Sequence, residues 1–138
     1  MRSALQSVFP GIDFRLNVSI SGAGVVTMTP EFGYGSVWRS ASDVGGGVLD
    51  VAAFGARVAV LLLATPARPR VLILDEPFKH VSADKLPAVC GMVRQVSESF
   101  GVQFIIVAHE QDMADAAHAV FVVTKQSGKS SASTESST

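Results

Sequence analysis

Two acidic residues, Asp75 and Glu76, come directly after an apolar run at residues 71–74. Such a run is typical of a central parallel strand that is covered on both faces. Ligands bind beyond the carboxyl ends of strands of this kind, and unpaired carboxylates beside a dry core are costly. An aspartate there can hold Mg²⁺, and a neighbouring glutamate can polarise an attacking water. The alternative is a strand that ends in a solvated acidic turn.

His109 ends a second apolar run, residues 102–108, which predicts a strand parallel to the first. The acidic pair and this imidazole are therefore expected to emerge at the same edge of the sheet. A lone histidine is more often a packed or surface residue, but the position at a strand end favours a function for His109. His80 and His118 lack such a position, and we expect them to lie at the surface or in local packing.

Three glycines, Gly45, Gly46 and Gly47, precede a long apolar stretch that predicts a buried helix over residues 48–64. Glycines let the backbone approach a phosphate closely, and a helix start offers N–H groups and the positive end of the helix dipole. A flexible turn is the alternative interpretation of three glycines taken alone. Their spacing from Asp75 favours the phosphate-binding interpretation.

The first forty residues predict an antiparallel β element. Residues 12–20 alternate strictly between apolar and polar side chains, which is typical of a strand with one buried face. Residues 22–24 predict a turn and residues 25–29 the returning strand. Proline and glycine in residues 30–36 predict a loop, and residues 37–39 predict a short third strand.

The second half of the chain alternates strands with helices, which predicts a parallel sheet flanked by helices. Apolar residues at 3–4 spacing predict a helix over residues 86–100 that Gly101 ends, with Asp84 as its cap and Pro87 in its first turn. A short helix and a last strand follow.

These last two elements are expected at residues 111–117 and 120–123. The polar, serine-rich residues 126–138 predict a disordered tail.

The composition indicates one compact domain of 138 residues, with 48% hydrophobic and 17% charged residues. A net charge of −1 gives no basic surplus for a stand-alone nucleic-acid binder. The single cysteine, Cys90, excludes an internal disulfide, favours a reducing compartment, and lies in an apolar helical pattern that predicts a core position. The longest apolar run, residues 58–64, is too short to span a bilayer. We therefore expect a cytoplasmic protein without a membrane segment.

The apolar strand and the Asp-Glu-Pro that follows it resemble the Walker B strand of ABC ATPases. Over residues 10–123 the chain resembles the C-terminal lobe of SMC and SbcC-like ATPase heads, phage-encoded relatives included. The resemblance implies an α/β, P-loop NTPase-like lobe over residues 1–125, in which the β element is residues 1–40 and the motifs occupy residues 41–125. It implies that Asp75 binds Mg²⁺ and that Glu76 is the catalytic base of ATP hydrolysis.

Gly45, Gly46 and Gly47 match the position of the ABC signature motif. In the family this motif grips the γ-phosphate of an ATP molecule that the opposing protomer holds. The family has Ser directly before the glycine pair, where this chain has Val44. Ser42, two residues earlier, is the hydroxyl that could take its place.

Two further segments complete the resemblance. Residues 81–85 resemble the D-loop, which lies at the dimer seam, and so place Ser82 and Asp84 in the nucleotide-binding set. A simple helix cap is the alternative role of Asp84. His109 resembles the switch histidine, which contacts the γ-phosphate, and is the second catalytic residue that the resemblance implies.

The phosphate-binding pattern Gly-x-x-x-x-Gly-Lys-Ser/Thr does not occur in the sequence. Gly128, Lys129 and Ser130 match its end, but the first glycine would fall at Val123 and no apolar helix follows. In the family this Walker A loop belongs to an N-terminal lobe that is joined through a long coiled coil. We therefore expect a fragment, an engineered half or a naturally split subunit.

The resemblance implies half of an ATP-hydrolysing head of a DNA repair or recombination ATPase. Its partners would be a Walker A lobe, a second head that sandwiches ATP, DNA and a nuclease subunit, and its cofactors ATP and Mg²⁺. The isolated chain is expected to hydrolyse ATP poorly or not at all. The alternatives are a non-catalytic, ATP-dependent dimerisation module and an unrelated flavodoxin-like enzyme.

Overall fold

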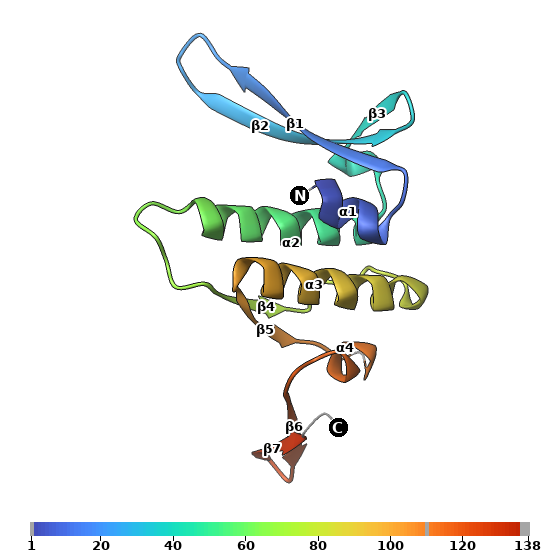
Figure 1. The fold of residues 1–138 in the computed structure, drawn as a ribbon, viewed down its shortest axis with the longest axis vertical. Coiled ribbons are helices and arrows are strands. Elements are labelled where there is room, and N and C mark those ends of the chain that lie inside the picture. Colours follow the sequence, from blue (N-terminus) through green and yellow to red (C-terminus); the bar gives the residue numbers. More distant parts are fainter. Residues whose placement is uncertain (1, 110, 136–138) are drawn as a thin grey trace.

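The computed structural model describes residues 2–109 and 111–135, which form the stack of layers in Figure 1. An antiparallel sheet lies at one end of the stack, and helices occupy the middle. A two-stranded parallel sheet and then a small hairpin follow toward the other end. The prediction of an α/β fold with both a parallel sheet and an N-terminal antiparallel sheet is confirmed.

The antiparallel sheet consists of β1 (Ile12–Ile20), β2 (Val26–Tyr34) and β3 (Val37–Ser40), with β2 in the centre. The register pairs Ile12 with Tyr34 and Ile20 with Val26, so the even-numbered residues of both long strands share one face. This face is apolar and the other is polar, as the alternation in the sequence predicted. The predicted burial holds only at the start of β1, because Leu16, Val18 and Ile20 are exposed.

The predicted loop at residues 30–36 is wrong, because β2 continues to Tyr34. Its pairing with β3 begins only at Glu31, so the sheet is open on that side at Pro30, where a missing backbone donor is tolerated. Gly33 lies under the indole of Trp38. A Cβ atom added at Gly33 would come within 3.1 Å of that ring, so the glycine permits the contact.

The helix α1 (Arg2–Val8) was not predicted from the sequence. Leu5 and Val8 face the protein interior and are almost fully buried. Seven residues contain only two such positions, which is too few to establish a helical period in a sequence.

The two long helices, α2 (Gly46–Leu63) and α3 (Leu86–Phe100), confirm the predicted helices. α2 is long and apolar enough to cross a membrane by length and composition alone, a property that core helices share. In this fold it supplies the centre of the core. The Phe54 ring lies 5.4 Å from that of Phe78 and 5.2 Å from that of Phe104.

The ends of α3 confirm two of the predicted start and stop signals and contradict the third. Gly101 ends the helix in the left-handed conformation, with φ of 61°, and Pro87 lies in the first turn. Asp84 does not cap the helix. The short 3-10 helix η2 (Ala83–Lys85) precedes α3, and no side-chain hydrogen bond caps the start of either helix.

The strands β4 (Val71–Asp75) and β5 (Gln103–Val107) form the parallel sheet, and α3 connects them. Leu72 and Leu74 on β4 face the core, whereas Val71 and Ile73 point to the opposite face and are exposed. The prediction that this strand is covered on both faces is therefore wrong for this chain, because no described element packs on the second face. The short helix α4 (Gln111–Asp115) follows β5, as predicted.

The strands β6 (Val120–Gln126) and β7 (Lys129–Glu135) pair with each other rather than with the parallel sheet. The predicted last strand therefore exists, but its predicted place in the parallel sheet is wrong. The predicted disordered tail is also wrong up to Glu135, and residues 136–138 lie outside the described part of the chain. Ser127 and Gly128 both have positive φ, 49° and 80°, as a two-residue type I′ hairpin turn requires.

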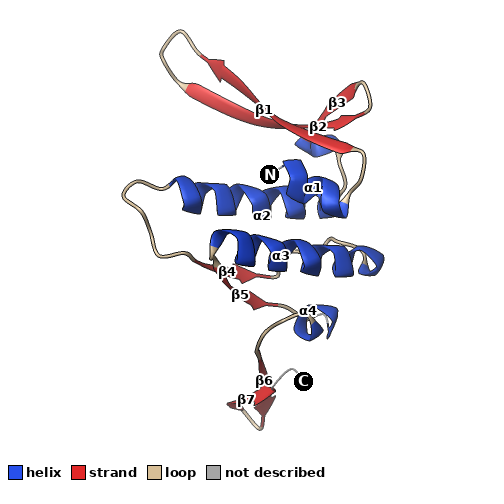
Figure 2. Cartoon of the chain, viewed as in Figure 1, coloured by secondary structure: helices blue, strands red, loops and turns tan. Residues whose placement is uncertain are grey.

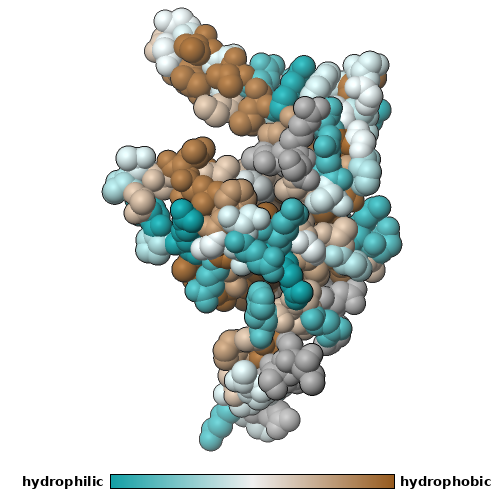
Figure 3. Space-filling view, viewed as in Figure 1, coloured by the Kyte–Doolittle hydropathy of each residue, from teal (hydrophilic) through white to brown (hydrophobic). Residues whose placement is uncertain are grey.

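The outer half of the β1–β2 hairpin carries exposed apolar side chains on the same face that is buried near α1. Figure 3 shows this hydrophobic surface on the projecting hairpin, and a second hydrophobic area across a hollow on the end of α2. The hairpin residues are Leu16, Val18, Ile20, Val26 and Met28.

Candidate functional site

The carboxyl ends of β4 and β5 lie side by side and bring Glu76 to the imidazole of His109. Asp75 pairs with Val107, and the Glu76 amide donates to the Val107 carbonyl at 2.9 Å. His109 follows two residues later, and its Nε2 lies 3.1 Å from Glu76 Oε1. An ionised carboxylate only accepts hydrogen bonds, so a hydrogen bond here requires that Nε2 carries the proton.

The backbone at Glu76 explains how this contact arises. Glu76 has a φ of 42°, in the left-handed region that is unfavourable for a residue with a Cβ atom. This sharp change of direction sends Pro77 and Phe78 into the interior, where both are buried. The Glu76 side chain remains 39% exposed at the sheet edge, and that of His109 is 82% exposed. A ligand therefore has access to both groups.

Asp75 lies on the open face of the parallel sheet, because it shares its side of β4 with Val71 and Ile73. Within the described residues, no three His, Cys, Asp or Glu side chains form a metal-binding group. A carboxylate without further protein ligands fits Mg²⁺, which is commonly held by one or two carboxylates together with substrate phosphates and water.

The helix α2 begins directly at the glycine motif, with Gly45 as its N-cap and no side-chain hydrogen bond at the cap. The amides of Val48 and Leu49 donate to the Gly45 carbonyl, at 3.0 and 3.3 Å. The amides of the first helical residues have no acceptor within an α-helix, so this start can receive an anion.

Ser42 does not lie at the start of α2. It belongs to the 3-10 helix η1 (Ala41–Asp43), and its hydroxyl lies 2.6 Å from Ser40 Oγ and 3.3 Å from Asp43 Oδ1. Val44 is half-buried and packs against the core. Packing thus accounts for an apolar side chain at position 44, and a nucleotide contact by Ser42 stays a prediction.

Ser82 lies just before η2, and Asp84 lies within it. The Asp84 carboxylate is well exposed, and its nearest cation is Lys85, whose Nζ is 4.0 Å away. Because Asp84 does not cap α3, its alternative structural role is excluded. The D-loop role of these two residues stays a prediction.

Sequence reasoning missed one contact that joins these segments. Asp50, on the second turn of α2, accepts a hydrogen bond from the His80 amide at 2.9 Å and lies 3.2 Å from His80 Nδ1. His80 was predicted to lie at the surface or in local packing. Its side chain is 55% exposed, so the surface position is confirmed, but its partner is thirty residues away in the sequence. No periodicity or motif pairs the two positions.

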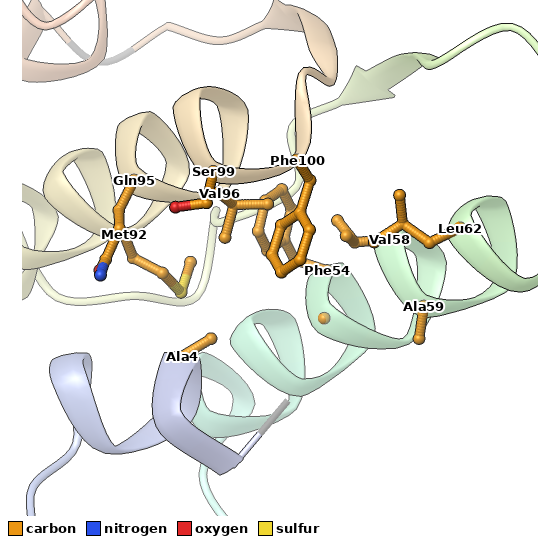
Figure 4. A pocket seen from close by; sticks show the side chains of 11 residues that line it. Ala4, Phe54, Val58, Ala59, Leu62, Met92, Gln95, Val96, Ser99 and Phe100 are labelled. Carbon is orange, nitrogen blue, oxygen red and sulfur yellow. The ribbon is translucent and has the colours of Figure 1, made fainter.

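The elements that carry the candidate residues share one side of the molecule. The sequence colours of Figure 1 show that α2 and α3 both start on the right, where the arrows of β4 and β5 in Figure 2 also end. A hollow of about 320 Å³ lies elsewhere, between later turns of α2 and α3 (Figure 4). Its lining is mainly apolar and includes Phe54, Val58, Leu62, Met92, Val96 and Phe100.

Comparison with known proteins gives short sequence matches and long structural ones. No family model matches the chain. Two lipoprotein-releasing system ATP-binding proteins, LolD, match short stretches. The protein from Francisella tularensis is 26% identical over 58 residues, which is 42% of this chain and 25% of the relative. The protein from Shewanella denitrificans is 32% identical over 47 residues, 34% of this chain and 20% of the relative. The chain thus matches a quarter or less of their length.

Solved SMC heads match nearly the whole chain. An SmcHead bound to the C-winged helix domain of ScpA superposes with a TM-score of 0.79 at 19% identity, over 98% of this chain and 40% of that one. A structure from work on ATP-driven dimerisation of SMC ATPases gives 0.77 at 18% identity, over 99% and 81%. The Smc head of Pyrococcus yayanosii gives 0.78 at 19% identity, over 99% and 26%. The chain therefore has the fold of part of an SMC head.

Proposed function

We propose that this chain is the C-terminal half of an ATP-hydrolysing head that acts in DNA repair or recombination, in the SbcC-like branch that includes phage proteins. The observation that carries the proposal is the contact between Glu76 and His109 at the shared carboxyl edge of two parallel strands. The SMC-head fold and the short LolD matches support an ATPase-type domain around this edge.

The chemistry assigns a separate role to each group at the edge. Glu76 would accept the proton of the attacking water. His109 would donate a hydrogen bond from Nε2 to the terminal phosphate once its contact with Glu76 is released. Asp75 would hold Mg²⁺, whose charge would stabilise the phosphate oxygens. The exposure of both Glu76 and His109 supports such a rearrangement.

A second lobe is expected to cover the exposed face of the parallel sheet. Parallel sheets are normally covered on both faces. Here one face carries α3, while the other exposes Ile73, Ile105 and Val107. We propose that a Walker A lobe packs on this face and supplies the phosphate-binding loop. The chain spans 40% of the SmcHead that it resembles, which leaves room for such a lobe.

The start of α2 would serve a second head. Gly45, Gly46 and Gly47 present the helix N-terminus. The segment that leads to Ser82 and Asp84 packs against it, because Gly46 and Gly47 adjoin His80 and Val81. We propose that these two segments face an ATP molecule bound by the opposing head, in the cytoplasm. Head closure would then be transmitted to DNA and to a nuclease partner.

Complementation tests the proposal. The chain is mixed or co-expressed with a Walker A lobe, and Mg-ATP binding, ATP-dependent association of heads and phosphate release are measured. Turnover by the mixture but not by the chain alone is the expected result. Nucleotide-dependent association without phosphate release would favour the non-catalytic module instead. Turnover by the isolated monomer, or no nucleotide binding by the mixture, would contradict the proposal.

A further inference from the structure

The start of α2 is tied to the segment that follows Glu76 by a pair of side chains outside the motifs. The Asp50 carboxylate accepts from the backbone amide of His80 and lies within 3.3 Å of its Nδ1 through both oxygens. The Asp50 side chain is 19% exposed and that of His80 55%. One carboxylate thus holds both the main chain and the imidazole of His80.

Two glycines of the motif pack directly against the same segment. A Cβ atom at Gly46 would lie 2.8 Å from His80 Cβ, and one at Gly47 would lie 3.0 Å from the His80 carbonyl oxygen. Gly45 has no neighbour within 4 Å of such an atom. Gly46 and Gly47 therefore permit close helix-to-loop packing, whatever else their amides bind.

We propose that Asp50 and His80 are positioning residues that hold the start of α2 in register with the Glu76 edge. His80 follows Glu76 by four residues, and the buried Pro77 and Phe78 between them anchor the connection in the core. The Asp50 contact then joins α2 to this segment. A displacement of either the helix start or the edge is transmitted to the other. The proposal rests on the proposed function for its consequence, but the coupling itself is a property of this chain.

The coupling predicts a local effect when the pair is broken. The amides of Val48 and Leu49 report on the helix start, because both donate to Gly45, and the Val81 amide, which donates to Phe78, reports on the other side. In Asp50→Ala and His80→Ala we expect hydrogen exchange at these three amides to accelerate about tenfold or more, since a charge-assisted contact is lost. Exchange in the middle of α3 should change much less.

The controls separate positioning from a general loss of stability. Lys79→Ala alters an exposed cation beside His80 and should leave the three reporter amides within about twofold, as expected for a surface change. His80→Gln retains a side-chain donor and Asp50→Asn retains an acceptor, so both should recover part of the protection and remain folded if an alanine variant does not. The proposal would be overturned if hydrogen exchange accelerated as much in the middle of α3 as at the three reporter amides. It would also be overturned if exchange at the reporter amides accelerated in none of the variants.

A second measurement uses the chain complemented with a Walker A lobe. His80→Ala should leave Mg-ATP binding to one head within about twofold, because His80 is not among the residues proposed to bind the nucleotide of that head. ATP-dependent association of two heads should weaken about tenfold, in keeping with the loss of one charge-assisted contact. Unchanged association together with accelerated exchange would show that the pair does not position the helix start for the second head, and would overturn that consequence. If the wild-type mixture binds no ATP, the proposed function fails, while the exchange result still decides the coupling.

Discussion

Two acid–imidazole pairs in this molecule have nearly the same geometry but different surroundings. Glu76 and His109 meet at 3.1 Å, and Asp50 and His80 at 3.2 Å. The first pair stands at an open sheet edge, whereas the second also binds a backbone amide and adjoins two tightly packed glycines. An acid and an imidazole in contact can therefore serve two purposes. The exposed pair is available to a ligand, whereas the pair with a backbone partner and close neighbours holds two elements together.

The largest expected effect concerns the exposed pair, Glu76 and His109. In a head complemented with a Walker A lobe, Glu76→Gln should lower ATP turnover by about 10²- to 10⁴-fold, because the amide cannot accept the proton of water. Phosphate release under saturating Mg-ATP measures this. Glu98→Gln, which alters an exposed acid on α3, is the matched control and should turn over normally. Equal turnover by Glu76→Gln and the wild type would remove the chemical role from this pair.

The contact between Asp50 and His80 should be disturbed by a larger side chain beside it. Gly46→Ala would force a Cβ atom against His80 and should lower the free energy of unfolding by about 1–3 kcal/mol. Gly45→Ala meets open space and should change it by about 0.5 kcal/mol or less. Urea denaturation of the two variants measures the difference. If both alanines are tolerated equally, the packing at the start of α2 is looser than the structure indicates.

Removing one member of each pair compares the two pairs directly. Asp50→Ala deprives the His80 amide of its acceptor and should cost about 1–2 kcal/mol of unfolding free energy. His109→Ala removes an 82% exposed side chain and should cost about 0.5 kcal/mol or less. Thermal or urea denaturation again provides the measurement. An equal loss in both variants would abolish the distinction between the pairs.

The smallest effect is expected at a third charged contact, on the β1–β2 hairpin. The hydrogen bond from Arg15 Nε to Glu31, 2.6 Å long, is the main cause that lowers the pKa of Glu31 below its ordinary value of 4.5. A lowered folded-state pKa stabilises the fold above the unfolded-state pKa, and this stability is lost as the pH falls through the folded value. Arg15→Gln should therefore show a slightly weaker loss of stability on acidification. An identical acid profile would indicate that solvent screens the contact fully.

Local sequence signals predicted most of the elements that carry the candidate site. The apolar runs before Asp75 and His109 predicted two parallel strands, and strand-end logic then predicted that Glu76 and His109 meet. Gly101 predicted the end of α3. These signals succeed because each depends on a few consecutive residues or on a rule about strand ends.

The elements that sequence reasoning missed depend on contacts distant in the chain or on a single turn. α1 offers only Leu5 and Val8 as core positions, and the Asp50–His80 contact joins residues that no motif relates. The serine-rich composition of β7 predicted disorder, yet the turn at Ser127 and Gly128 aligns it with β6. Composition describes an average tendency, whereas one two-residue turn can set the pairing of a whole strand.

The left-handed backbone at Glu76 implies a tension between folding and chemistry at this position. A residue with a Cβ atom there loses about 1–2 kcal/mol relative to the right-handed conformation, a cost that glycine avoids. If stability alone mattered, glycine would be favoured at position 76, and no carboxylate would lie at the edge of the sheet. The molecule instead keeps a carboxylate in a main-chain conformation that is costly for any residue with a Cβ atom, as expected where a side chain is needed for what it does to other molecules.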